Sequence, residues 1–302
     1  YKELIYRYIS FLLYAQNEQG MFRNFMTYNR EFIDEVGSED CFGRCLWALG
    51  FTLSSESVPV NMKLAAKHIL DKALPNCDKL NSPRAKAYST IGLGYLLDNR
   101  GYECEYEYEK AEPYLKRMVE SLAELYCNCR AENWHWFEDI IAYGNEVLPW
   151  AMLVGYKITG EEKFKDIGLE SLAFLDSKTF KNGYFKPVGC NGWLRKEDED
   201  NGAEFDEQPL EACEAILAYL EAYRIIGDET YVEKAIKCFK WFEGENSKKL
   251  PLIDPETGGC YDGITQYGVN LNQGAESLIS YMISALTLRK MMNERVMNEI
   301  IS

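Results

Sequence analysis

Apolar residues recur at helical spacing along most of this 302-residue chain. The segment 228–243 shows the pattern most clearly, because Tyr231, Ala235 and Phe242 share one helical face while charged residues fill the opposite face. The same spacing predicts an all-α fold with ten helical segments. They lie at 2–18, 39–53, 58–74, 82–98, 106–127, 140–158, 161–177, 207–226, 228–243 and 275–292.

Two of these segments carry small or apolar residues around most of their circumference. The segment 207–226 combines a stripe of large apolar residues with alanines, and 82–98 contains Gly92 and Gly94. Glycine lowers helix propensity, so a packing reason for these positions is expected. Helices with two packed faces suit an inner ring, and helices with one apolar face suit an outer ring. The alternation therefore predicts an (α/α)6-type toroid of five to six helical hairpins.

Connections between the predicted helices are of two kinds. The turns at Thr159–Gly160 and around Gly227 are minimal, as expected between antiparallel neighbours. Alternate loops of an up-down array lie on the same side, so we expect the long loops on one rim. No Pro-, Gly- or Ser-rich linker divides the chain, which predicts a single domain over 1–302. The long connections lie at 19–38, 128–139, 178–206 and 244–274.

Three motifs stand out in the predicted loops. They are Trp134-His135-Trp136-Phe137-Glu138-Asp139, Phe205-Asp206-Glu207-Gln208-Pro209-Leu210-Glu211-Ala212 and Gly258-Gly259-Cys260-Tyr261-Asp262-Gly263. They are similar to motifs of helical domains found beside, or fused to, bacterial glycosyltransferases, and the architecture resembles the six-hairpin glycosidase-like (α/α) toroid superfamily. The resemblance implies carbohydrate metabolism, an oligosaccharide or monosaccharide ligand, and a fusion to or association with a glycosyltransferase.

The long loops also supply candidate catalytic carboxylates. Glycoside hydrolysis needs two carboxyl groups, of which one protonates the leaving oxygen and the other attacks or activates water. Asp206 and Glu207 rank first because they lie where a long loop enters 207–226. Asp206 has an alternative role as a helix cap, with Pro209 just inside the helix. Asp139, which follows two tryptophans, is the predicted partner of Asp206 or Glu207.

The remaining candidate residues are predicted to hold the substrate. Aromatic rings pack against the apolar faces of sugars, and amides both donate to and accept from hydroxyl groups. Asp40 and Arg44 are four residues apart and can pair on one helical face. For the two tryptophans and for Tyr261 and Asp262, core packing and turn formation are the alternatives. The predicted binding residues are Asp40, Arg44, Trp134, Trp136, Glu138, Trp193, Tyr261, Asp262, Asn272, Gln273 and Glu276.

Composition excludes several other classes of protein. A net charge of -15 disfavours nucleic acid as a partner. Neither a signal peptide nor a long apolar run is present, so no membrane association is expected. The ten cysteines of a chain with a full core need not pair, which favours a reducing, cytoplasmic setting. Cys127, Cys129 and His135 match no strong zinc spacing, and phosphate-binding motifs are lacking, so we expect neither a metal nor a cofactor.

These observations favour a glycoside hydrolase that acts on an oligosaccharide through paired carboxylates. The alternative is a non-catalytic glycan-binding module, or an accessory domain of a glycosyltransferase. A sugar epimerase is less favoured. The 2-epimerases of similar shape use a pair of histidines, whereas this chain contains only His68 and His135, and His68 lies on the ordinary predicted helix 58–74.

Overall fold

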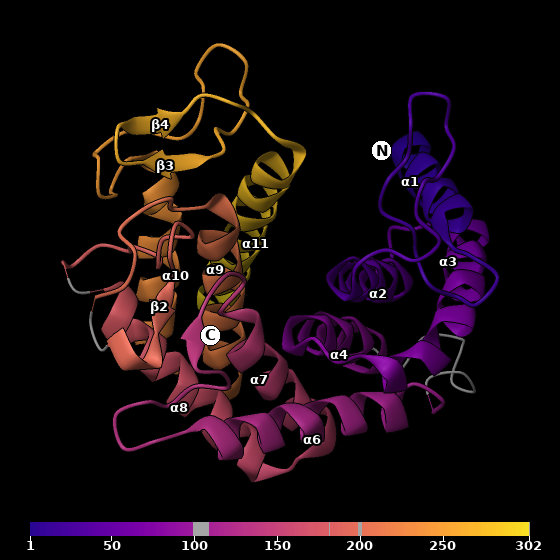
Figure 1. Ribbon diagram of the computed structural model, residues 1–302, viewed down its shortest axis with the longest axis horizontal. Helices are drawn as coiled ribbons and strands as arrows, with labels where there is room; N and C mark the ends of the chain where they lie inside the picture. Colours follow the sequence, from indigo (N-terminus) through magenta and orange to yellow (C-terminus); the bar gives the residue numbers. More distant parts are fainter. Residues whose placement is uncertain (99–108, 181, 199–200, 302) are drawn as a thin grey trace. The chain divides into compact units, whose positions relative to one another are not determined.

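A computed structural model describes residues 1–98, 109–180, 182–198 and 201–301, with side chains described as far as residue 296 (Figure 1). This part of the chain contains ten α-helices and two short antiparallel strand pairs, which agrees with the all-α prediction. It forms two compact units. The first unit comprises residues 1–125 and 151–166, and the second comprises residues 126–150 and 167–302.

Close helix packing characterises the first unit. An added Cβ at Gly50 would lie 1.9 Å from the Gly92 carbonyl oxygen, so α2 and α4 approach backbone to backbone. Burial of twelve of the sixteen α4 residues confirms that 82–98 packs on more than one face. The helices that contribute to this unit are α1 (Lys2–Ala15), α2 (Glu39–Ser54), α3 (Val60–Ala73), α4 (Pro83–Asp98), and parts of α6 (Glu112–Cys129), α7 (Val147–Thr159) and α8 (Glu162–Thr179).

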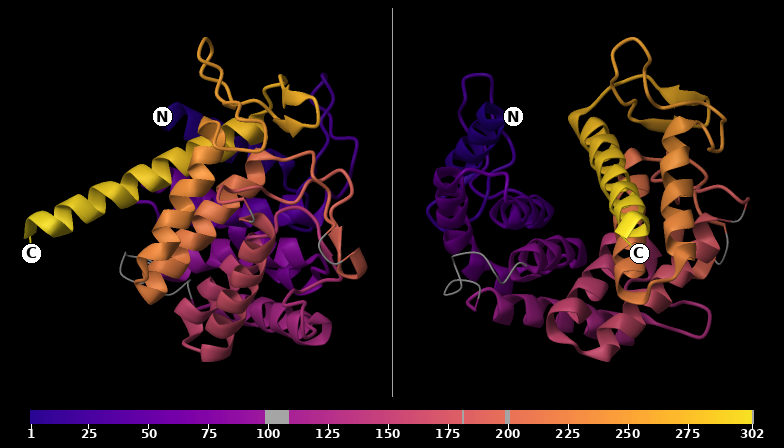
Figure 2. Two further views of the ribbon diagram at one scale, coloured as in Figure 1. Left: turned by 90° about the vertical axis from the view of Figure 1, so that its left-hand side faces the viewer. Right: turned by 180° about the vertical axis from the view of Figure 1, so that it is seen from behind.

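The second unit is built around α9 (Pro209–Ile226), whose residues from Pro209 to Ala222 are all buried. Both α10 (Glu229–Glu243) and α11 (Ala275–Ile301) pack against α9. Gly227 ends α9 in the left-handed conformation, and the Asp228 side chain caps α10 by accepting from the Thr230 amide. Figure 2 shows that the last turns of α11 extend past α9 and α10.

Two strand pairs order the long loops of the second unit. β1 (Ile140–Ile141) pairs with β2 (Leu194–Arg195), and β3 (Gly263–Thr265) pairs with β4 (Gly268–Asn270). The predicted helix 140–158 therefore begins only at Val147. Ile140 and Ile141 are β-branched residues that pair with the loop 178–206 instead of starting a helix.

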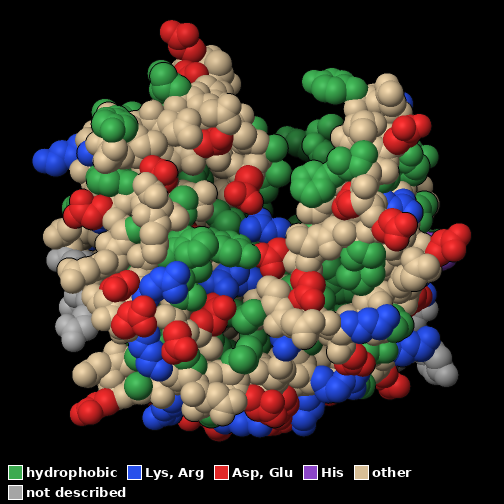
Figure 3. Space-filling model, in the orientation of Figure 1, with side chains coloured by type: hydrophobic (Ala, Val, Ile, Leu, Met, Phe, Trp, Pro, Cys, Tyr) green, Lys and Arg blue, Asp and Glu red, His purple; other side chains and the backbone are tan. Residues whose placement is uncertain are grey.

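The surface carries the charge expected from the composition. Figure 3 shows acidic and basic side chains interspersed over the face in view. In the part of the chain that the structure describes, no helix has both the length and the apolar character needed to cross a membrane.

Candidate functional site

A pocket of about 430 Å³ lies in the second unit, next to one of the predicted catalytic carboxylates. Two carboxylates, two aromatic rings, two amides and a hydroxyl group surround it, which is the mixture that suits a polyhydroxylated ligand. We call it the Asp206 pocket. Its lining residues are Asn191, Glu204, Phe205, Asp206, Thr265, Gln266 and Tyr267.

Backbone pairing fixes Asp206 in this pocket. The Cys190 amide donates to the Asp206 carbonyl at 2.9 Å, and the Asn191 amide donates to the Phe205 carbonyl at 3.0 Å. Gly189 permits this close approach, because an added Cβ there would lie 2.2 Å from the Phe205 carbonyl oxygen. The loop 178–206 is thereby folded back on itself. Its consecutive residues Glu204, Phe205 and Asp206 line the pocket.

Asp206 does not serve as the cap of α9. The capping position is occupied by Gln208, which makes no capping hydrogen bond through its side chain. Asp206 lies two residues earlier and faces the pocket. Of the two roles left open for this residue, the structure thus disfavours the cap.

Glu207 points away from the pocket and into the core, where its exposed fraction is 0%. Its carboxylate accepts hydrogen bonds from Trp241 Nε1 at 2.7 Å and from Ser247 Oγ. Its backbone pairs with Ile264 through two hydrogen bonds of 2.9 Å. Burial raises the pKa of Glu207, and the bonds from Ser247 and Trp241 oppose that effect. Glu207 therefore ties the start of α9 to α10 and to β3.

Two lysines flank the aromatic wall of the pocket. Lys248 Nζ lies 4.6 Å from the centre of the Phe205 ring, and Lys186 Nζ lies 5.5 Å from it. Lys186 also approaches Glu204 to 3.9 Å, and Lys248 donates to the Gln266 carbonyl at 2.7 Å. These contacts hold both edges of the pocket together, because they link the loop 178–206 to the β3–β4 turn.

A second group of predicted residues lies at residues 270–276, which we call the amide loop. Asp262 accepts from the Gly274 amide at 2.6 Å, from Ser277 Oγ at 2.7 Å and from the Asn272 side chain. Partial burial acts to raise the pKa of Asp262, but these hydrogen bonds outweigh it and lower the pKa overall. Asp262 thus fixes the start of α11 and the orientation of Asn272.

Gln273 is held in the same way by another carboxylate. Its Nε2 donates to Asp254 at 2.8 Å, and Thr257 Oγ1 donates to its Oε1 at 3.2 Å. Asn272 and Gln273 are nevertheless exposed, and Glu276 is exposed in the first turn of α11. Tyr261, beside Asp262, is half-buried. The amide loop therefore offers hydrogen-bonding groups with fixed orientation to the solvent.

The two predicted tryptophans lie in the core of the second unit. Trp134 is 4% exposed and Trp136 is 0% exposed. Their Nε1 atoms donate to the carbonyls of Glu138 and Ile140 at 2.8 Å and 3.1 Å. Both rings pack against Phe174. This arrangement corresponds to the packing alternative for these residues.

Asp139 lies on the surface beside this cluster. Its carboxylate accepts from Cys129 Sγ at 3.3 Å and from Lys196 Nζ at 3.1 Å. Those two hydrogen bonds lower the pKa of Asp139. Glu138, the preceding residue, is half-buried. Neither residue belongs to the lining of the Asp206 pocket.

Three predicted residues lie elsewhere. Asp40 and Arg44 belong to α2 in the first unit, where Asp40 accepts from Ser82 Oγ at 2.9 Å and the Arg44 guanidinium lies 4.8 Å from the Tyr88 ring centre. Trp193 adopts a left-handed conformation with φ 60 in the loop 178–206. Its backbone pairs with Gly189 and Ala203, behind the pocket-lining segment.

A cluster of buried carboxyl groups in the second unit, which contains Glu146, Glu211 and Glu214, was not predicted from the sequence. Glu146, Glu211 and Glu214 are exposed by 1%, 3% and 0%. Glu211 accepts from the Gly144 amide at 2.6 Å and from the Asn145 side chain at 3.0 Å. Burial, together with the charges of Glu211 and Glu214, raises the pKa of Glu146 well above its ordinary value.

This carboxyl cluster lies near the loop that carries the pocket. Burial raises the pKa of the Cys190 thiol, and the charges of Asp206 and Glu211 both add to the effect. The sequence signal was present, since Glu211 and Glu214 are one turn apart on a helix that has no polar face. Buried carboxyl groups of this kind are typical of functional sites and of structural networks alike.

The other chemistry of the described residues is limited. Within the described ranges, no group of three or more His, Cys, Asp or Glu residues could hold a metal ion, and the nine described cysteines are free. His135 Nδ1 lies 2.9 Å from Glu170 Oε1, and His68 is exposed on α3. The described lining of the Asp206 pocket contains no histidine.

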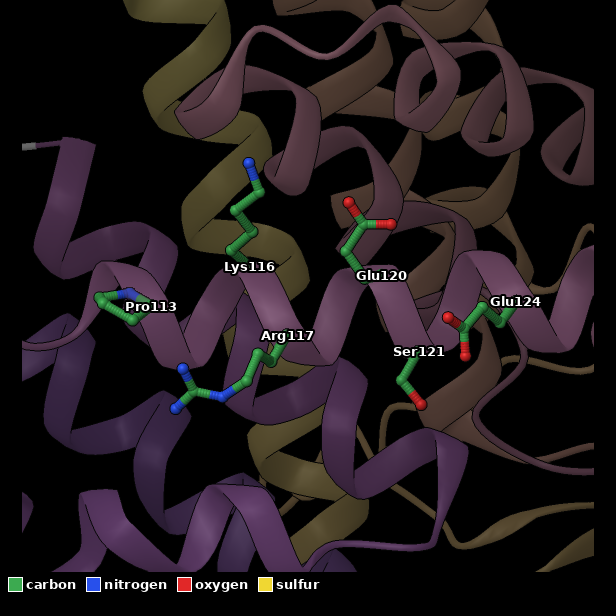
Figure 4. A pocket seen from close by; sticks show the side chains of 6 residues that line it. All are labelled: Pro113, Lys116, Arg117, Glu120, Ser121 and Glu124. Carbon is green, nitrogen blue, oxygen red and sulfur yellow. The ribbon is translucent and has the colours of Figure 1, made fainter.

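A further pocket in the first unit is lined by residues of α6 (Figure 4). Three of its four charged side chains are paired with neighbours. Arg117 lies 2.8 Å from Asp78, Lys116 lies 2.8 Å from Glu161, and Glu120 accepts from Lys163 at 2.7 Å. None of the predicted site residues belongs to this pocket.

Comparison with known proteins adds evidence on the fold. The chain matches no protein-family model and no curated protein. Among solved structures, it is similar to a GH76 alpha-mannanase from Bacteroides thetaiotaomicron, with 12% identity and a TM-score of 0.61 over 93% of this chain and 77% of that one. It is also similar to a D-mannose isomerase, with 12% identity and a TM-score of 0.60 over 95% of this chain and 86% of that one.

A third similar structure is a glycoside hydrolase family 76 mannosidase from Bacteroides thetaiotaomicron VPI-5482. It is 11% identical, with a TM-score of 0.58 over 97% of this chain and 83% of that one. At these identities the likeness shows the fold alone. The chain shares the (α/α) toroid fold of these structures, which confirms the fold predicted from the alternating helices.

Proposed function

We propose that this protein is carbohydrate-active, and that it binds an oligosaccharide in the Asp206 pocket and hydrolyses a glycosidic bond there. The observation that supports this most directly is the lining of the pocket, where two carboxylates accompany aromatic, amide and hydroxyl groups. Hydrolysis requires such a carboxyl pair beside the scissile bond. Two of the similar structures are named as mannose-polymer or mannoside hydrolases, which is consistent with the proposal.

We assign the acid and base roles to Asp206 and Glu204, which both line the pocket. Glu207 is then a positioning residue. Its buried carboxylate accepts from Trp241 and Ser247, and its backbone pairs with Ile264 of β3. Asp139 stays a predicted catalytic residue, and the same assay tests it. The association with a glycosyltransferase likewise stays a prediction.

Hydrolysis of a panel of aryl glycosides and oligosaccharides tests the proposal. General acid–base catalysis contributes roughly 10²- to 10⁴-fold to a rate, so Asp206→Asn and Glu204→Gln should each lose at least about 100-fold in kcat. Asp139→Asn is assayed beside them, and a comparable loss of kcat would assign a catalytic role to Asp139, whose carboxylate accepts from Lys196 and Cys129. Turnover by Asp206→Asn equal to that of the wild type would remove this residue from the mechanism.

One observation favours a second function, a non-catalytic glycan-binding module. Two of the three carboxylates predicted as catalytic, Asp139 and Glu207, are engaged by neighbouring donors. The exposed amides of Asn272 and Gln273 in the amide loop are also suited to binding sugar hydroxyl groups, which needs no catalytic group. Calorimetry with the same glycans separates the two functions. Binding in the Asp206 pocket without product after long incubation supports the binding module, whereas detectable hydrolysis supports the enzyme.

A further inference from the structure

The β3–β4 hairpin joins the Asp206 pocket to the amide loop. Its turn and the end of β3 supply Thr265, Gln266 and Tyr267 to the pocket. Its second strand ends at Asn270, where the amide loop begins. The β3–β4 hairpin, which is labelled in Figure 1, therefore connects the two groups of candidate binding residues in the second unit.

The two faces of this hairpin differ, because Ile264 on one face is buried and Asn270 at the end of the other face is exposed. The register pairs Ile264 with Val269 and Thr265 with Gly268, so Ile264 and Val269 share a face, and Ile264 is 0% exposed. Alternation places Thr265, Gly268 and Asn270 on the opposite face. An added Cβ at Gly268 would meet only Leu250 Cδ1, at 3.9 Å. We call Thr265, Gly268 and Asn270 the outward face. Because Gly268 has no side chain, nothing projects from the centre of this face.

The length of this face exceeds that of one sugar ring. Asn270 pairs with Gly263, which lies two residues before Thr265 on β3. Two residues of a strand span about 6.6 Å, so Thr265 and Asn270 are separated by about this distance along the strand direction. The amide loop extends beyond Asn270 by several residues. One sugar ring beside Asp206 covers only part of this length, whereas a chain of several sugars can extend along it toward Gln273.

Groups suited to sugar recognition lie at both ends of the outward face. Tyr267 is 91% exposed at the turn, and Leu271 is 70% exposed beside the amides. Apolar side chains in these places can cover the C–H faces of sugar rings. Asn272 and Gln273 are held by Asp262 and Asp254, so little conformational entropy is lost when they bind hydroxyl groups.

From these observations we infer that an oligosaccharide lies along the outward face, with one end in the Asp206 pocket and the other on the amide loop. This inference rests on the proposed function, and it specifies the substrate class. The site selects extended oligosaccharide chains over monosaccharides. It also identifies Gln273 and Leu271 as residues that recognise the distal part of the chain.

Calorimetric titration with mannose, mannobiose and mannotetraose, and with the matching glucose series, tests the inference. The wild type should bind the tetrasaccharide of one series at least about ten-fold more tightly than its monosaccharide, which is the effect of one or two net hydrogen bonds. Gln273→Ala and Leu271→Ala should reduce this preference to below about three-fold and leave monosaccharide affinity unchanged. Tyr267→Ala should weaken binding of all chain lengths alike.

The matched control is Glu256→Ala, which removes an exposed side chain from the same loop 244–274 outside the outward face. It should leave the preference for long chains intact. Thermal unfolding of each variant shows whether the loop remains folded, and Leu271→Ala removes a side chain that is mostly in solvent. Equal losses for short and long chains in both amide-loop variants would overturn the inference. So would monosaccharide binding as tight as that of the tetrasaccharide.

The experiment also separates this inference from the proposed function. If sugars bind and Asp206→Asn weakens their binding, but the length of the oligosaccharide has no effect on affinity, the Asp206 pocket is supported and the extended site is wrong. If no sugar of either series binds, or Asp206→Asn leaves all affinities unchanged, the proposed site itself fails and the inference fails with it.

Discussion

The buried carboxylate of Glu207 offers a sharp test of how the pocket is supported. Glu207→Gln keeps the size of the side chain but replaces one acceptor oxygen by an NH2 group. In the wild type, Trp241 Nε1 and Ser247 Oγ both donate to this carboxylate, and the residue is 0% exposed. Ser247 can rotate its hydroxyl to accept from the new amide. Trp241 has only a donor, and it loses a charge-assisted partner.

The cost follows from that loss. A hydrogen bond to a charged group contributes about 1.5–3 kcal/mol and a neutral one about 0.5–1.5 kcal/mol, so Glu207→Gln should lower the free energy of unfolding by the difference, about 1–1.5 kcal/mol. Urea unfolding followed by tryptophan fluorescence measures it. The control is Glu204→Gln in the same loop, where the side chain is 74% exposed and a change within about 0.5 kcal/mol is expected. A Glu207→Gln variant as stable as the control would refute the supporting role of Glu207.

Two further predictions concern stability. Burial and the charges of Glu211 and Glu214 raise the pKa of Glu146, so its contribution to stability is complete below the ordinary value of 4.5 and is lost as pH rises toward the folded pKa. While only the folded chain holds the proton, stability falls by about 1.4 kcal/mol per pH unit. Glu146→Gln should remove this slope from free energies of unfolding in urea measured at increasing pH above 4.5, and an unchanged slope would contradict this. Gly50→Ala places a Cβ 1.9 Å from the Gly92 carbonyl oxygen and should cost about 1–3 kcal/mol, whereas Gly160→Ala meets no atom within 4 Å and tests backbone strain alone. A Gly50→Ala variant as stable as the wild type would show that the α2–α4 contact is not close.

Helical periodicity carried most of the fold prediction. The segments 207–226 and 228–243 differ in how many faces are apolar, and α9 and α10 differ in burial in the same way. The segment 140–158 was predicted less well, because the pairing of Ile140 and Ile141 with residues 194–195 depends on a distant loop. Local periodicity contains no information on such a partner.

The candidate site was only partly predictable, for a related reason. The loop position of Asp206 identified it, but the structure places Asp206 in the pocket and the adjacent Glu207 in the core, and loop position alone does not distinguish these two neighbours. Thr265 and Tyr267 join Asp206 through the pairing of Glu207 with Ile264, which spacing along the chain does not reveal. A tryptophan beside polar residues, such as Trp136, looks the same in sequence whether it packs in a core or against a sugar.

The most direct test of the account is a crystal of the protein soaked with a mixture of mannose- and glucose-containing oligosaccharides. We expect electron density for a sugar in contact with Asp206 and Tyr267, which continues along β3–β4 to Gln273. Density over Asp139 and Lys196 with an empty Asp206 pocket would contradict it.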